Sequence, residues 1–124
     1  MKILVVDDER DVKILFQQQF RKEIRNGELQ FAFAYSGEEA VRITEVMAQE
    51  ELFILSDINM PGMNGLELLK TIKKKFVKPS PVMMIISAYG DEENRNRAKN
   101  LGADDFLTKP VDFTLLKTKL KELT

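Results

Sequence analysis

Cysteine and histidine are both absent from this chain of 124 residues. Without cysteine there are no disulfides, zinc–thiolate sites or thiol nucleophiles. Without histidine, the serine–histidine and cysteine–histidine hydrolase mechanisms are excluded, and so are metal sites built on histidine. Any metal ion must therefore be held by oxygen ligands, which favours magnesium, calcium or manganese.

Long apolar runs and a strong net charge are missing as well. No run is long enough to span a bilayer, and the N-terminus lacks the basic-then-apolar layout of a signal peptide. Together with the lack of disulfides, these features fit a cytoplasmic protein without membrane insertion. The net charge of −1 gives no global field that would attract nucleic acid. The length fits one domain, residues 1–124, with one core.

Short apolar runs alternate with amphipathic segments along the whole chain. The apolar runs predict five strands, at 2–6, 29–34, 52–56, 82–86 and 104–107. Between and after them we expect five helices: one continuous helix from Val12 to Ile24, one opened by Ser36 and Glu39, one capped by Asn64 and Glu67, a polar one at roughly 91–100, and a last one bearing Phe113, Leu116 and Leu120. A loop over 78–81 precedes the fourth strand. This alternation predicts a doubly wound α/β fold, a parallel sheet with helices on both faces.

Charged and polar residues follow four of the five predicted strands. Asp7, Asp8 and Glu9 follow the first, Asp57 the third, Ser87 the fourth and Lys109 the fifth. Each residue alone has an ordinary explanation as a helix cap, a turn former or an exposed lysine. If the strand order is 2-1-3-4-5, however, these strand ends are successive neighbours and the side chains share one crevice. Their joint occurrence favours a functional site.

The charges of this set predict what it binds. Two carboxylates about 5 Å apart repel by roughly 3 kcal/mol at an effective dielectric constant of about 20. Asp7, Asp8 and Asp57 therefore need a cation among them; Lys109 supplies one charge, and magnesium would offset more. A crevice with a metal ion, an ammonium and a hydroxyl suits phosphoryl oxygens, with Asp57 as the nucleophile.

Four motifs occur in a familiar order: "ILVVDDE", "DINMPGMNGLELL", "IISAYG" and "GADDFLTKP". In them the chain resembles the receiver domain of two-component response regulators, which has the flavodoxin-like fold with five parallel strands in the order 2-1-3-4-5. The resemblance implies that Asp57 accepts a phosphoryl group, in a magnesium-dependent reaction, from a histidine kinase or a histidine phosphotransfer protein. It also implies a signalling switch rather than an enzyme.

The resemblance also implies roles for individual residues. Asp8, Asp57 and the backbone carbonyl of Asn59 would bind Mg²⁺ directly, and Asp7 mainly through water. Ser87 and Lys109 would contact the phosphoryl group, and a cis peptide would join Lys109 to Pro110. The remaining roles concern the switch and hydrolysis: Ser87 and Phe106 would change conformation, and Asn59 and Tyr89 would lie where the hydrolytic water enters. We hypothesise that bulky Tyr89 restricts that water and lengthens the phosphorylated lifetime.

The chain ends one helix after the last motif, so we expect a stand-alone receiver without an output domain, like chemotaxis regulators and phosphorelay intermediates. It would contact a downstream protein through about residues 91–124, a polar face. Three alternatives are weaker. A flavin or nucleotide module needs a glycine- or hydroxyl-rich cradle after the first strand. A phosphohydrolase commonly has a second acid where Asn59 stands. A receiver-like adaptor would have lost an acid or the lysine.

Overall fold

Five parallel strands form the centre of the molecule. The computed structural model describes residues 1–47, 51–78 and 80–122. Pro79, in the predicted loop over 78–81, and residues 123 and 124, at the end of the predicted contact face, lie outside these ranges. Within them the sheet has the predicted order β2-β1-β3-β4-β5. The strands are β1 (Lys2–Val6), β2 (Gln30–Ala34), β3 (Leu52–Asp57), β4 (Val82–Ser87) and β5 (Asp105–Thr108). Every boundary lies within one residue of its prediction.

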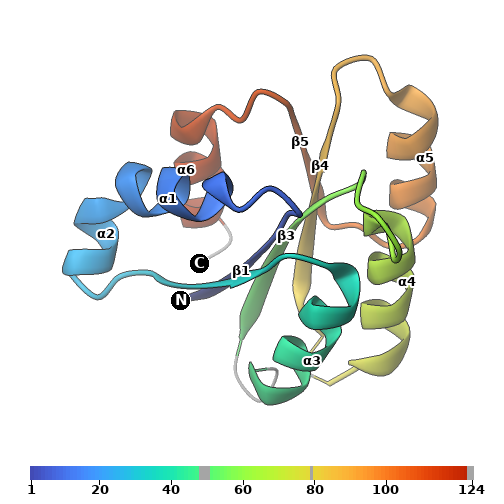
Figure 1. Ribbon diagram of the computed structural model, residues 1–124, viewed down its shortest axis with the longest axis horizontal. Coiled ribbons are helices and arrows are strands. Elements are labelled where there is room, and N and C mark those ends of the chain that lie inside the picture. Colours follow the sequence, from blue (N-terminus) through green and yellow to red (C-terminus); the bar gives the residue numbers. More distant parts are fainter. Residues whose placement is uncertain (48–50, 79, 123–124) are drawn as a thin grey trace.

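Helices cover both faces of the sheet (Figure 1). They are α1 (Asp11–Gln19), α2 (Arg21–Arg25), α3 (Gly37–Met47), α4 (Gly65–Lys75), α5 (Glu92–Asn100) and α6 (Phe113–Glu122). α1 and α6 lie on one face, and α3, α4 and α5 on the other (Figure 1). No helix in the described part of the chain is long and apolar enough to cross a bilayer.

The continuous helix predicted from Val12 to Ile24 is wrong, because the chain leaves helical geometry at Phe20 (φ −110°, ψ 21°). The Phe20 ring is fully buried and packs against Phe16 and Phe31, with centroids 5.9 and 5.1 Å away. The break therefore falls at a buried core residue. The apolar spacing of three and four continues across the break, which is why the pattern did not reveal it.

Alternation along the strands divides the core into two layers. In β1, Ile3 and Val5 face the layer beneath α1 and α6, whereas Leu4 and Val6 face the layer beneath α3, α4 and α5. β3 is buried along its whole length. A central strand covered on both faces has no solvated side, which explains why its sequence is a continuous apolar run. Asp57, at its end, is thus held by a strand that is buried throughout.

Caps fix where α3 and α4 begin, close to the carboxyl edge of the sheet. The Asn64 side chain accepts a hydrogen bond from the Glu67 amide (2.9 Å), and Glu67 accepts one from the Asn64 amide (3.2 Å), so these two residues cap α4 as predicted and form a capping box. Ser36 Oγ accepts from the Glu39 amide (3.1 Å) at the start of α3. The loops between strand and helix are therefore short and defined at both ends.

Candidate functional site at the carboxyl edge of the sheet

The structure brings the predicted strand-end residues together at one edge. Asp7 directly follows β1, Asp57 and Ser87 end β3 and β4, and Lys109 directly follows β5. Asp7, Asp57 and Ser87 are 8%, 4% and 3% exposed. The Lys109 amide donates to the Ser87 carbonyl oxygen (2.9 Å), so the sheet pairing continues into the site. The neighbour relationships inferred from the strand order are confirmed.

A buried carboxylate and an ammonium pair at the centre. Lys109 Nζ donates to Asp57 Oδ2 (2.7 Å), while Asp57 Oδ1 accepts from the Asn59 amide (3.3 Å). Partial burial lowers the pKa of Lys109, but the hydrogen bond and negative charge of Asp57 outweigh it and hold that pKa above its usual value. Lys109 is therefore a permanent cation beside Asp57 at neutral pH.

Asp57 also faces two other carboxylates, those of Asp7 and Asp8. Asp7, Asp8 and Asp57 each offer a carboxylate oxygen, and these oxygens lie within 4.8 Å of one another. Burial raises the pKa of Asp7; the hydrogen bond from the Glu9 amide lowers it, and the charge of Asp57 raises it again, with a net increase. Lys109 alone does not compensate this much negative charge. An all-oxygen donor set with surplus negative charge fits a hard divalent cation.

Gly65 is a site-shaping residue that the sequence analysis missed. A Cβ atom there would lie 2.3 Å from the carbonyl oxygen of Asp57 and 2.7 Å from Cα of Ile58. The first turn of α4 therefore packs directly on the backbone that carries Asp57. A weak signal was present, because glycine is a poor helix former and here stands at the first helical position after the Asn64 cap.

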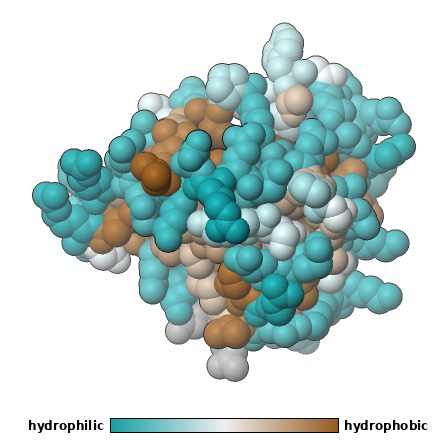
Figure 2. Space-filling model, in the orientation of Figure 1, coloured by the Kyte–Doolittle hydropathy of each residue, from teal (hydrophilic) through white to brown (hydrophobic). Residues whose placement is uncertain are grey.

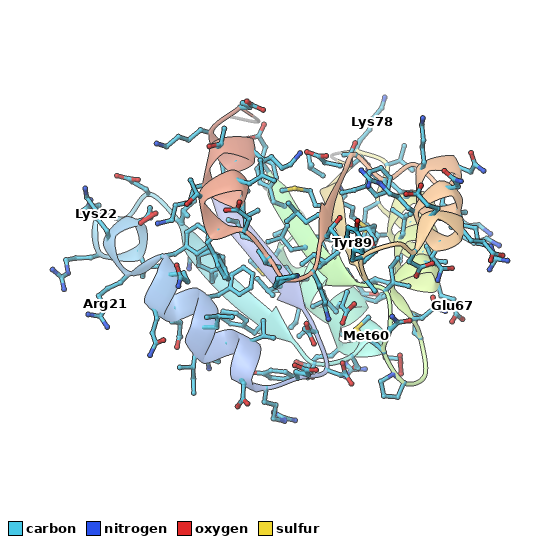
Figure 3. The ribbon with its side chains drawn as sticks, turned by 90° about the horizontal axis from the view of Figure 1, so that it is seen from above. Arg21, Lys22, Met60, Glu67, Lys78 and Tyr89 are labelled. Atoms are coloured by element: carbon cyan, nitrogen blue, oxygen red, sulfur yellow. The ribbon has the colours of Figure 1, made fainter. Side chains whose placement is uncertain are left out.

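Asn59 and Tyr89, the residues predicted beside the path of the hydrolytic water, lie in the two loops that follow β3 and β4. Asn59 is exposed and Met60 is buried in the β3–α4 loop, residues 58–64. Tyr89 is 90% exposed in the β4–α5 loop, where it lines one hollow with Lys109 and another with Ser87. Met60 and Tyr89 are labelled in Figure 3 and mark these two loops. The peptide between Lys109 and Pro110 is cis, as expected.

Phe106 lies half-buried in β5 against the core layer of α3, α4 and α5. The guanidinium carbon of Arg95 in α5 stands 5.1 Å from the centre of the Phe106 ring. The surface of α5 near Phe106 is polar, since α5 exposes mainly charged and amide side chains. In the view of Figure 2, apolar atoms gather near α1 and in a second patch at the lower edge of the molecule; α1 exposes Ile14 and Leu15.

A doubly wound sheet with an acidic crevice and a lysine at its carboxyl edge is the arrangement expected of a receiver domain. The family model of the response regulator receiver domain matches residues 3–121, and the chain belongs to this family. Receiver domains of two-component systems are phosphoacceptor switches that work with histidine kinases and downstream effectors, and they are generally not enzymes.

Individual relatives support the same family. The chain is 39% identical over 87 residues to a cyclic di-GMP phosphodiesterase of Thermotoga maritima, covering 70% of this chain and 22% of that one. A receiver domain protein from Clostridium thermocellum has a TM-score of 0.80 at 27% identity, over 99% and 98% of the two chains. The Vibrio cholerae chemotaxis protein CheY4 shares the fold, with a TM-score of 0.81 at 22% identity over 99% and 98% of the chains.

Several relatives are longer than this chain. It spans less than a quarter of the curated relative from Thermotoga maritima. It also spans 48% of a response regulator/GGDEF domain protein, whose structure it matches with a TM-score of 0.84 at 26% identity over 98% of its own length. That the chain acts as a single domain without an output domain stays a prediction.

Proposed function

We propose that Asp57 takes a phosphoryl group from a phosphohistidine of a histidine kinase or histidine phosphotransfer protein, and that the phosphorylated chain signals by protein contact. The observation that carries this proposal is the pairing of Asp57, almost fully buried, with Lys109 at 2.7 Å inside a cluster of acids. A carboxylate fixed in this way is oriented as a nucleophile before any donor arrives.

In the proposed transfer, an Asp57 carboxylate oxygen attacks phosphorus and the bond from phosphorus to the donor's imidazole nitrogen breaks. The electron pair of that bond stays on the nitrogen, and the phosphoryl group becomes an acyl phosphate on Asp57. The Lys109 ammonium offsets the charge on the phosphoryl oxygens. Asp8, Asp57 and the carbonyl of Asn59 would hold Mg²⁺, with Asp7 bound through water; when bound, the ion neutralises negative charge in the crevice.

The proposed switch uses Ser87 and Phe106. The Ser87 hydroxyl, at the end of β4, would donate to a phosphoryl oxygen, and the Phe106 ring on the neighbouring strand would move inward behind it. Phe106 already packs partly against the core, so this move buries more of the same ring. It has no phenolic hydroxyl to offer a partner.

The contact surface for a downstream protein would lie within about residues 91–124, described as far as residue 122. Its charged side chains, on α5 above all, favour a polar and reversible interface. The complete lack of cysteine fits a reducing compartment, so the proposal includes a cytoplasmic location.

Intact-mass measurement after incubation with acetyl phosphate tests the proposal directly. Wild-type protein should gain one phosphoryl group in the presence of Mg²⁺ and none after chelation of the metal. Asp57→Asn should gain none under either condition while keeping its fold, as judged by circular dichroism. No gain in wild-type protein under any condition would refute the proposal and favour an adaptor that works without phosphorylation.

A further inference from the structure

The segment that joins β2 to the first turn of α3, residues 35–38, supplies no carboxylate to the acid cluster, yet it contacts two loops beside that cluster. The Arg10 guanidinium, in the loop that carries Asp8, lies over the Tyr35 ring at 4.3 Å. Glu38 Oε1 accepts a hydrogen bond from the Met63 amide (3.1 Å) in the β3–α4 loop. This segment thus joins the loop that carries Asp8 to the loop that follows Asp57.

The β3–α4 loop fits closely against the start of α3. A Cβ atom on Gly37 would lie 2.8 Å from the Met63 side chain and 2.9 Å from its carbonyl oxygen. On the other side, a Cβ atom on Gly62 would lie 3.2 Å from a carboxylate oxygen of Glu38. Glycine at both positions lets the loop approach the helix, and Gly62 adopts a φ of 71° that disfavours other residues.

Polar anchoring of this loop is sparse. Within residues 60–63, all of which the structure describes, the Met63 amide is the one backbone N–H with a hydrogen-bond partner, and that partner is Glu38. On either side of this stretch, the Asn59 amide bonds to Asp57 and the Asn64 amide to Glu67. Glu38 is therefore the polar contact that ties the middle of the loop to another element.

We infer that Glu38 is a positioning residue for the metal site, assisted by Tyr35. This inference rests on the proposed function, in which the Asn59 carbonyl and Asp8 bind Mg²⁺. Glu38 holds the loop that carries Asn59, and Tyr35 holds the loop that carries Asp8. With the Glu38 contact removed, the loop samples more conformations, and the ion must order it on binding, which weakens affinity.

Calorimetric titration with Mg²⁺ tests the inference. Glu38→Ala should raise the Mg²⁺ dissociation constant about fivefold, less than the roughly 10–100-fold typical of residues that orient metal ligands, because the bond is exposed. Glu38→Gln loses the charge but keeps an oxygen acceptor, so its affinity should remain near that of wild type. Glu45→Ala is the matched control, since Glu45 lies on the same helix and pairs with Lys75.

Hydrogen exchange separates positioning from overall stability. The Met63 amide should exchange faster in Glu38→Ala but not in Glu45→Ala, with the unfolding midpoint of the metal-free protein equal in the two variants. Tyr35→Leu should weaken Mg²⁺ binding in the same way, and Tyr35→Phe should not. The two Tyr35 variants test the inference independently if Glu38→Ala folds poorly.

Three results would overturn the inference. Wild-type affinity in both Glu38→Ala and Tyr35→Leu would show that these contacts do not position the site. Equal weakening in Glu38→Ala and Glu38→Gln would assign the effect to charge instead of the hydrogen bond. A wild-type protein that binds no Mg²⁺ would refute the metal step of the proposed function, and the inference with it, and is recognised before any variant is made.

Discussion

Lys109 and Asp57 are 52 residues apart in the chain, and yet Lys109 Nζ lies 2.7 Å from Asp57 Oδ2. The Asp57 side chain is 6% exposed, whereas that of Lys109 is 40% exposed. The carboxylate is thus held in the protein, while the ammonium reaches it from the edge of the crevice. Removing Lys109 therefore leaves the buried Asp57 carboxylate without its partner, whereas removing Asp57 leaves an ammonium that water can still reach.

Replacing Lys109 should therefore affect both stability and chemistry. Lys109→Ala leaves a buried carboxylate beside two other acids without its cation, and we expect the free energy of unfolding at neutral pH to fall by about 1–2 kcal/mol, less than for a fully buried pair. Phosphoryl gain from acetyl phosphate should fall strongly. Urea unfolding and intact mass measure the two effects.

Lys117→Ala is the control for this prediction, because Lys117 pairs with Glu23 at a comparable exposure, 38%, away from the acid cluster. It should phosphorylate as wild type does. Phosphorylation of Lys109→Ala at the wild-type rate would contradict a role for the ammonium in the transfer.

Asp7 should make the metal-free protein less stable as the pH rises. Its pKa in the folded protein is raised above the usual 3.8, by burial first and also by the charge of Asp57. The folded state therefore binds the proton more tightly than the unfolded state, so the stability contribution of Asp7 is complete below pH 3.8 and is lost as the pH rises through the folded-state pKa.

Asp7→Asn removes this dependence and keeps an oxygen that can accept from the Glu9 amide. At neutral pH we expect the metal-free variant to be more stable than wild type by about 1 kcal/mol, with the difference shrinking toward pH 4, and to bind Mg²⁺ more weakly. Urea unfolding with a chelator at several pH values measures it. A variant less stable than wild type at neutral pH would show that the charged Asp7 carboxylate does not destabilise the folded protein.

Strands and site neighbours could be predicted from the sequence because they follow from local rules. A buried parallel strand must be apolar throughout, and the carboxyl ends of adjacent strands must meet, so Asp57 and Lys109 were placed together correctly. The helix break at Phe20 was not predictable, because the apolar spacing of three and four continues across it. The close approaches of Gly65 to Asp57 and of Glu38 to Met63 depend on how separate segments dock, which no local pattern encodes.

Gly65 offers a test of how closely α4 must approach Asp57. Gly65→Ala places a Cβ atom 2.3 Å from the Asp57 carbonyl oxygen, so the helix or the strand end must shift. We expect a loss of about 2–4 kcal/mol of stability and a large reduction in phosphoryl gain. Thermal unfolding and intact mass report both.

Gly27→Ala separates this steric effect from backbone strain. Gly27 has a φ of 73°, but a Cβ atom there meets nothing within 4 Å. That variant should lose only about 1 kcal/mol, from the unfavourable φ, and should phosphorylate normally. Equal behaviour of the two variants would mean that the contact beneath α4 has no special effect on the site.

Tyr89 should control the lifetime of the phosphorylated state. Its side chain is 90% exposed and lines hollows with both Lys109 and Ser87, so it stands at the side of the crevice without being fixed by packing. If the ring restricts entry of the hydrolytic water, Tyr89→Ala should raise the dephosphorylation rate by about threefold, or roughly 0.6 kcal/mol in barrier height. Tyr89→Phe keeps the ring and should change the rate little. The decay of phosphorylated protein, followed by intact mass after removal of the donor, measures each rate. An unchanged rate in Tyr89→Ala would show that an exposed ring leaves the path of the water open.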